Sequence, residues 1–220
     1  MKEMNTSFDS KFTSSILLAF LLLWFVPRPG TAQDCYSIAD GAWQEESNWS
    51  NTSGGNSPCT NAANDKYPAS GESARVESSI FVLSTTTVGS LTQASTSGFL
   101  VLNGANLNIE GDFTVEGGGQ TSTFSTSNGL VIGSGVLDVD GNLTVESNGK
   151  LNVRRKSGSV GKLRLAGNFV NNGTFNSFTP GEPGTVTFDG GGSQSVSGTA
   201  SFTGGSAFDL LQVEGTSTVV

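Results

Sequence analysis

The sequence predicts an all-β chain, and within that class a right-handed parallel β-helix, a solenoid whose coils stack on one another. Short runs of apolar and β-branched residues recur from residue 80 to the end, and turns rich in Gly and Asn separate them. The segment Leu100–Gly119 also repeats as Leu130–Gly149. No stretch has the apolar spacing of an amphipathic helix of useful length.

The composition supports this class and excludes others. Thirty Gly occur without the strict three-residue period of collagen, and the recurrent apolar runs exclude disorder. Charged residues make up only 14% of the chain, and the net charge is −8. A protein this acidic repels phosphate backbones, which argues against nucleic acid as a partner.

The start of the chain has the pattern of an export signal. Lys11 belongs to a positively charged N-terminal segment, the n-region of a signal peptide. Residues 16–26 form an apolar run that is too short to span a bilayer comfortably. We expect residues 1–33 to be a signal peptide, cut after Ala32 or Gln33, with an uncleaved anchor as the alternative. No later segment is apolar enough to cross a membrane, so the expected location is extracellular or at the cell surface.

Residues 34–79 form a distinct region that holds both Cys and two of the three Trp. Cys35 and Cys59 follow the export signal, and cysteines of exported proteins commonly pair, so a disulfide between them is expected. The alternative is two free thiols or partners elsewhere.

Trp43 and Trp49 are the candidate ligand-binding residues. One interpretation is an aromatic platform on which sugar rings stack. The other is a cap over the open end of the first coil, since the ends of a solenoid need covering and large aromatic side chains do this well.

The repeats of residues 80–220 carry the prediction of stacked coils. The segment Leu100–Gly119 aligns with Leu130–Gly149, so that apolar residues meet apolar residues and turn glycines meet turn glycines. The matched pairs include Leu107 with Leu137, Ile109 with Val139, Val115 with Val145 and Gly111 with Gly141. One unit of short strands cannot bury its apolar side alone, whereas stacked coils bury a continuous column.

An antiparallel β-sandwich is the alternative fold. Asn103-Gly104, Asp140-Gly141 and Asn148-Gly149 are dipeptides typical of two-residue hairpins, which join antiparallel strands. We favour the β-helix because the repeat keeps its register throughout Leu100–Gly119. The expected organisation is thus a signal peptide, an N-terminal cap region and solenoid repeats.

Several motifs resemble those of a known group. Gly41-Ala42-Trp43 with Ser47-Asn48-Trp49-Ser50, and the later segments 167–175 and 184–190, resemble exported, adhesin-like β-helical repeat proteins of the Bacteroidetes that are associated with type IX secretion. The opening also resembles the G8 domain of extracellular proteins. The resemblance covers roughly residues 38–215.

The resemblance implies a surface protein that is often very long and ends in a C-terminal sorting domain. Nothing here resembles that domain, and the chain stops at Val220 within a predicted strand. We therefore expect an N-terminal fragment, whose partners include the downstream solenoid coils of the full-length protein.

Candidates for catalysis and metal binding are few. The chain has no His, which removes Ser-His-Asp and Cys-His catalysis from within it. Asp138 and Asp140 share a strand face, as a glycosidase pair would, but the Asp140-Gly141 turn explains them without chemistry. The acids considered for Ca²⁺ are Asp112, Glu116, Asp138, Asp140, Glu146 and Asp189. They lack RTX nonapeptides and an EF-hand loop, so we expect no catalytic residue, metal or cofactor.

The expected function is that of a non-enzymatic, secreted or cell-surface module of the adhesin-like or structural kind, with glycans or other surface proteins as partners. The alternative is the N-terminal part of a polysaccharide lyase or glycosidase whose catalytic residues lie outside this chain. A stalk without a ligand is the third possibility.

Overall fold

A computed structural model gives the arrangement of residues 34–55, 57–60, 65–94, 99–102, 104–118, 120–122, 135–153, 161–177, 184–200 and 210–220. The chain divides into two compact units, Met1–Thr31 and Ala32–Val220, and all the described residues belong to the second. The predicted signal peptide lies outside the described residues.

The described residues form an all-β structure with a single short turn of 3-10 helix, η1 (Glu46–Asn48). Sheet A contains β1 (Asp34–Ser37), β3 (Trp49–Ser50), β4 (Ser73–Val76), β7 (Ser90–Gln93), β10 (Phe113–Val115), β13 (Leu143–Val145), β16 (Phe169–Asn171) and β20 (Val196–Ser197). Sheet B contains β2 (Gly41–Ala42), β5 (Ile80–Val82), β8 (Phe99–Leu102), β11 (Gln120–Ser122), β14 (Lys150–Asn152) and β17 (Thr174–Asn176). Sheet C contains β6 (Thr86–Val88), β9 (Asn106–Ile109), β12 (Val136–Val139), β15 (Lys162–Leu165), β18 (Thr185–Phe188) and β21 (Leu210–Val213). A small fourth sheet pairs β19 (Ser193–Gln194) with β22 (Thr218–Val219).

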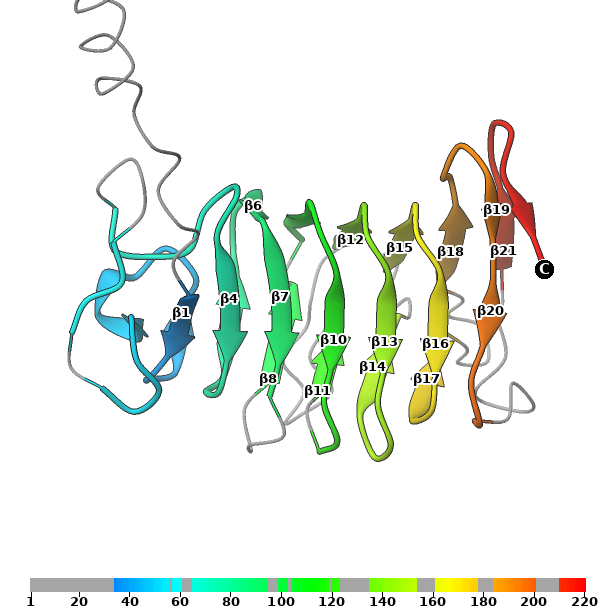
Figure 1. Cartoon of the computed structure of the whole chain (residues 1–220). Coiled ribbons are helices and arrows are strands. Elements are labelled where there is room, and N and C mark those ends of the chain that lie inside the picture. Colours follow the sequence, from blue (N-terminus) through cyan, green and yellow to red (C-terminus); the bar gives the residue numbers. More distant parts are fainter. Residues whose placement is uncertain are drawn as a thin grey trace, which may run out of the picture. The chain divides into compact units, whose positions relative to one another are not determined.

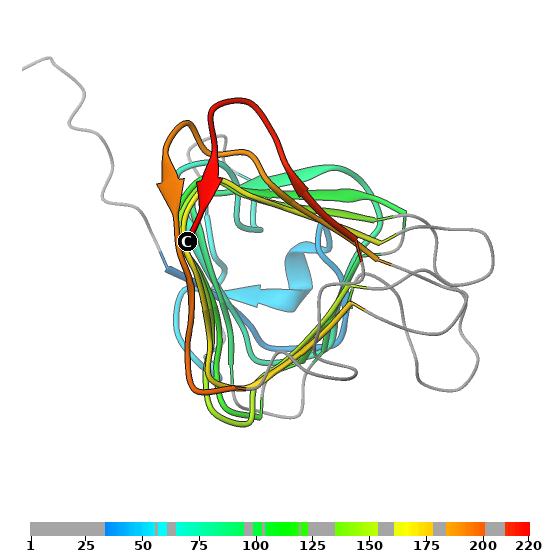
Figure 2. The same ribbon diagram turned by 90° about the vertical axis from the view of Figure 1, so that its right-hand side faces the viewer.

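The chain visits the three large sheets in rotation. From β4 to β18 the strands alternate among the three sheets in a fixed order. Each of them except β6, which begins sheet C, pairs in parallel with the strand one circuit earlier. Figure 1 shows the strands of sheet A from β1 through β4, β7, β10, β13 and β16 to β20 side by side in chain order, and β3 lies on the other side of β1. Figure 2 looks along the stack and shows the three sheets as the sides of a three-sided outline.

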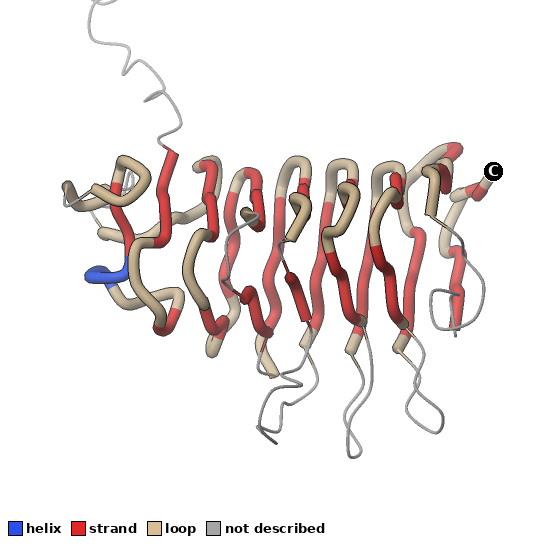
Figure 3. Tube along the Cα trace, turned by 90° about the horizontal axis from the view of Figure 1, so that it is seen from below, coloured by secondary structure: helices blue, strands red, loops and turns tan. Residues whose placement is uncertain are grey.

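This topology is compatible with a β-helix and does not fit the alternative sandwich. Among the described strands, only β1 and β3 pair antiparallel, whereas a sandwich built from hairpins would require antiparallel pairs throughout. The dipeptides Asp140-Gly141 and Asn148-Gly149, which suggested hairpins, lie at corners between sheets. Figure 3, seen from below, shows short strands joined by such corners, with η1 at the end of the stack that holds β1 and β3.

The strand register confirms most of the predicted repeat. β9 pairs with β12 so that Leu107 lies opposite Leu137 and Ile109 opposite Val139. Each of these side chains is at most 1% exposed. The same inward-facing column continues through β15 and β18. It includes Leu163, Leu165, Val186 and Phe188, all buried. In sheet A, β10 pairs with β13 so that the buried Val115 lies opposite the buried Val145, also as predicted.

The start of the predicted alignment is different. β8 pairs with β5 and β11, so that Leu100 lies opposite Ile80 and Thr121 rather than Leu130. Leu130 itself lies outside the described residues. The predicted offset therefore holds for β9 to β11 against β12 to β14, and a shorter one, from Asp138 to Arg164, replaces it one circuit later.

Close approach of successive coils explains why Gly recurs at the corner before sheet A. A Cβ atom built on Gly141 would overlap the backbone of Gly111, and one built on Gly167 would overlap the backbone of Gly141. No other residue leaves room for the coil beneath at these points. The matched glycines of the repeat are therefore fixed by packing between coils.

A ladder of polar side chains runs beside these glycines. The Oδ1 atom of Asp112 accepts a hydrogen bond from the backbone N of Asn142 at 2.7 Å, and Oδ1 of Asn142 accepts one from the backbone N of Asn168 at 3.0 Å. Oδ1 of Asn168 accepts one from the backbone N of Ser195 at 2.8 Å. The ladder fixes the register of each coil on the one before it.

Candidate functional site

The predicted disulfide is present in the region that was expected to form the N-terminal cap. Cys35 on β1 is joined to Cys59, which follows β3, and the two Cα atoms are 5.5 Å apart. Both residues are completely buried. The bond ties the segment after β3 to the first strand of sheet A, and it suits an oxidising, extracellular environment.

The two tryptophans of the cap lie inside it. Trp43 and Trp49 are 0% and 1% exposed, and their ring centroids are 4.8 Å apart. Nε1 of Trp43 donates to the carbonyl of Pro68 at 3.1 Å, and Nε1 of Trp49 donates to the carbonyl of Trp43 at 2.7 Å. A stacking platform needs an exposed ring face, so the burial of both rings argues against the sugar-binding interpretation and for the cap. Figure 2 shows the chain of η1 and β3, in light blue, across the middle of the three-sided outline.

A buried group beside the disulfide has donor atoms of the kind that metals prefer. One ligand atom from each of Cys35, Cys59 and Glu72 lies within 4.8 Å of the others, and this is the one such group of three or more in the described part of the chain. The two sulfurs are bonded to each other, however, and metals bind the thiolate form of Cys. Glu72 accepts a hydrogen bond from the backbone N of Ala69 at 3.1 Å, so its carboxylate stabilises a turn.

The acids considered as a catalytic pair are not arranged as one. Asp138 lies on the outer face of sheet C, where Arg164 of the next coil contacts it at 3.7 Å and contacts Asp189 at 2.6 Å. Burial raises the pKa of the Asp138 carboxyl, and the positive charge of Arg164 opposes that rise. Asp140 is exposed at the corner beyond. The arrangement is an ion-pair ladder between coils.

The other acids considered for Ca²⁺ also have separate roles. Asp112 begins the polar ladder, and Glu116 binds Arg75. Glu146 lies one coil further on and is exposed.

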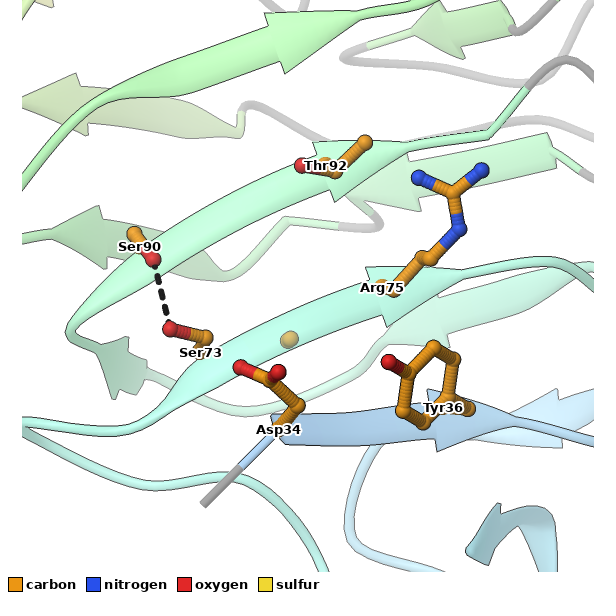
Figure 4. Close-up of a pocket in the computed structure, with 7 residues that line it drawn as sticks. Asp34, Tyr36, Ser73, Arg75, Ser90 and Thr92 are labelled. Atoms are coloured by element: carbon orange, nitrogen blue, oxygen red, sulfur yellow. Dashed lines mark hydrogen bonds between the residues drawn. The ribbon is translucent and has the colours of Figure 1, made fainter. Parts of the chain in front are cut away.

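A polar groove on the outer face of sheet A is the strongest candidate site. It crosses β1, β4 and β7, has a volume of about 230 Å³, and is shown in Figure 4. Its lining residues are Asp34, Tyr36, Ser73, Ala74, Arg75, Ser90 and Thr92. We call it the β1–β4–β7 groove.

The alternation of the three strands builds this groove. Cys35, Ala74 and Leu91 point into the core, so their neighbours in the sequence point outward. The register then aligns Asp34 with Ser73 and Ser90 in one row, and Tyr36 with Arg75 and Thr92 in a second. Figure 4 shows these two rows. The small hydroxyl side chains lie lower than their larger neighbours and leave the hollow.

Arg75 forms a rigid wall of the groove. Its Nη1 and Nη2 atoms donate to the two carboxylate oxygens of Glu116 at 2.7 and 2.8 Å, and its Nε atom donates to Glu77 at 3.0 Å. The hydrogen bonds to Glu116 are the main cause that raises the pKa of Arg75. Such bidentate pairs fix the guanidinium plane. Glu116 follows β10, so the pair also spans the coil of β7.

Asp34 and Tyr36 leave polar groups available at the groove. Asp34 is exposed and Tyr36 is partly exposed. Within the described part of the chain, neither the Asp34 carboxylate nor the Tyr36 hydroxyl has a hydrogen-bond or ion-pair partner. Between the rows' small residues, Ser90 Oγ donates to Ser73 Oγ at 2.9 Å.

A second hollow, with a volume of about 360 Å³, is lined by the apolar residues Ile38, Trp49 and Pro58 and the polar residues Glu46, Ser47 and Lys66. Lys66 and Glu46 form an ion pair at 3.3 Å there, with both side chains about half exposed. Its polar groups are already paired, so it offers a ligand less than the β1–β4–β7 groove does.

No family model, curated protein or solved structure matches this chain. Among the described residues, no helix has the length and apolar character needed to cross a bilayer.

Proposed function

We propose that the region after residue 33 is a right-handed parallel β-helix that acts outside the cell as a non-enzymatic, adhesin-like binding module, and that the β1–β4–β7 groove binds a glycan. The rotation of the chain through three parallel sheets supports the fold. The Cys35–Cys59 disulfide supports the extracellular location.

One observation carries the binding function. The groove lies on a face of a sheet that is fixed by hydrogen bonds on both sides, and it presents a carboxylate and a phenol without partners in the described part of the chain. When a ligand supplies these partners, little of the binding free energy is spent on ordering the protein, because the backbone of the sheet is already fixed.

The carboxylates around the groove support a role without catalysis. A glycosidase needs two carboxyl groups that flank the scissile bond. Asp34 lines the groove, whereas the nearby Glu77 and Glu116 are hydrogen-bonded to Arg75. One available carboxylate can orient a sugar but cannot serve as both acid and base partner.

The test is a glycan array probed with the wild-type chain and with Tyr36→Ala. We expect wild-type binding to a defined set of glycans and a loss of about tenfold or more for Tyr36→Ala, because stacking on an aromatic ring supplies much of the contact area.

Val170→Ala is the matched control. Val170 lies in the same outward row of sheet A, four strands away from Arg75, so truncating it changes the surface without changing the groove. Binding by Tyr36→Ala equal to that of the wild type, or no binding to any glycan, would overturn the proposal.

A further inference from the structure

We infer that the groove takes a single neutral sugar ring with free hydroxyl groups, rather than a uronate, a sialic acid or a sulfated sugar. This inference rests on the proposed glycan-binding function and specifies its ligand. It follows from the charges, the hydrogen-bonding groups and the size of the groove.

The charges at the groove disfavour anions. Arg75 is the cation that lines it, and its guanidinium is held by Glu116 and Glu77, both negative. Asp34 adds a further negative charge that has no ion-pair partner in the described part of the chain. At separations of a few ångströms, the interaction energy between two charges is large enough to change the affinity for a ligand, even near the protein surface. An anionic sugar would meet net negative charge here, and the chain as a whole carries −8.

The hydrogen-bonding groups call for a ligand that both donates and accepts. An ionised carboxylate such as Asp34 only accepts, whereas a guanidinium only donates. Arg75 has five N–H groups, and Glu77 and Glu116 use three of them, which leaves two. Ser73, Ser90 and Thr92 add hydroxyls that do both. Sugar hydroxyls match this mixture, but a carboxylate or sulfate group could satisfy only the donors.

Tyr36 supplies the apolar part of the contact. Figure 4 shows its ring beside Arg75, with Asp34 and Ser73 along the same two strands. The C–H face of a pyranose can lie on the ring while its hydroxyl edge meets the polar row of Asp34, Ser73 and Ser90. Neutral sugars present such a face without a charged group at its rim.

The size limits the ligand to one ring. The groove has a volume of about 230 Å³. Pockets for drug-sized ligands occupy roughly 300–1,000 Å³. The groove is therefore suited to one monosaccharide unit, either free or at the end of a glycan.

The experiment compares neutral oligosaccharides with the same oligosaccharides carrying a uronate or a sulfate on the terminal ring, by calorimetry at fixed ionic strength. We expect the wild type to bind the neutral forms at least about tenfold more tightly, as loss of a hydrogen bond to a charged group predicts. Asp34→Asn should weaken neutral binding severalfold and narrow the difference between neutral and anionic ligands. Val170→Ala should change neither.

The outcomes separate the two proposals. Preferential binding of the anionic forms that Tyr36→Ala abolishes would overturn the neutral-sugar inference and leave the glycan-binding function standing. Loss of binding in Tyr36→Ala with no effect of Asp34→Asn would also overturn the inference, since Asp34 would then not contact the ligand. Failure of every form to bind would overturn the proposed function itself.

Discussion

At the scale of single residues, the groove depends on a cation that is positioned by acids outside it. Arg75 reaches past Thr92 to Glu116, two strands away in sheet A. The small side chain of Thr92 leaves the path open. The position equivalent to Glu116 in the next coil is Glu146, which is exposed, so the same repeat position has a structural role in one coil and faces solvent in the next.

Glu116→Gln should therefore affect both stability and binding. It removes one charge of a partly buried bidentate pair, and we expect a loss of roughly 1 kcal/mol in the free energy of unfolding. Ion pairs that are fully exposed contribute less than this to stability, whereas well-oriented bidentate pairs contribute more. Sugar affinity should fall as well, because the wall of the groove loosens. Glu146→Gln is the control and should change neither quantity in urea titrations and calorimetry. Equal effects of the two changes would show that Arg75 is held by other contacts.

The outer face of sheet C has a residue whose charge costs stability. Burial raises the pKa of Asp138 in the folded protein despite the nearby Arg164, and Asp189 and Asp140 add to the rise. A carboxyl whose folded pKa is raised favours folding while it is protonated. This contribution is present below its unfolded pKa and is lost as the pH rises through the folded pKa.

Asp138→Asn should therefore flatten part of the pH dependence of stability. The stability of the variant relative to that of the wild type should increase as the pH rises from about 4, the ordinary pKa of Asp, toward 7. The difference in the free energy of unfolding should stay below about 1 kcal/mol, because the side chain is partly exposed. Melting temperatures at a series of pH values measure this. Glu146→Gln, at an exposed position after β13 of sheet A and away from Asp138, is the control. A variant that loses stability over the same pH range would show that the ion pair with Arg164 outweighs the cost of burial.

At the scale of the elements, the corners restrict the choice of amino acid more strongly than the strands do. Strand positions accept Leu, Ile, Val or Phe in the buried column, as β10, β13 and β16 show with Phe113, Leu143 and Phe169. The corner before sheet A accepts only Gly at positions 111, 141 and 167, because the backbone of the preceding coil occupies the place of a Cβ atom.

Gly141→Ala should accordingly be costly. The added Cβ meets backbone atoms of Gly111, which cannot move without separating the coils. We expect a loss of about 2–3 kcal/mol in the free energy of unfolding, in the range of overpacking substitutions. Gly191→Ala is the matched control, since a Cβ there meets nothing within 4 Å. Guanidinium titrations of both variants measure this loss. If Gly141→Ala were as stable as the control, the corner would have room for a Cβ atom and the coils would not be in close contact there.

The same contrast explains what could be predicted from the sequence. The stacked apolar residues and their register from Leu107 to Val145 followed from the internal repeat, and the disulfide followed from two cysteines after a predicted export signal. The groove did not, because it depends on pairing Asp34 with Ser73 and Ser73 with Ser90, and neither separation equals the offset of the internal repeat. The sequence left open whether Trp43 and Trp49 form a sugar platform or a cap, and the structure buries both rings, with their N–H groups donating to carbonyl oxygens.

At the scale of the whole molecule, stacked coils make stability depend on neighbouring contacts. In such an arrangement each coil contacts only the coils before and after it, so stability is approximately a sum over interfaces. Leu137 lies between Leu107 and Leu163 in the column, and all three are completely buried. A defect at Leu137 therefore affects two interfaces at once.

Leu137→Asp should unfold the middle of the stack before its ends. The aspartate would lie among apolar side chains of the two adjacent coils without a partner for its charge, and we expect a loss of about 3–5 kcal/mol. Hydrogen exchange should accelerate first in β9, β12 and β15, while β1, fastened by the disulfide, and β4, which pairs with β1, keep their protection. Thr144→Asp introduces the same charge on the outer face of sheet A and should leave the exchange pattern unchanged. If Leu137→Asp exchanged uniformly along the chain instead, the coils would unfold as one cooperative unit, and contacts between neighbours alone would not describe the stability of the stack.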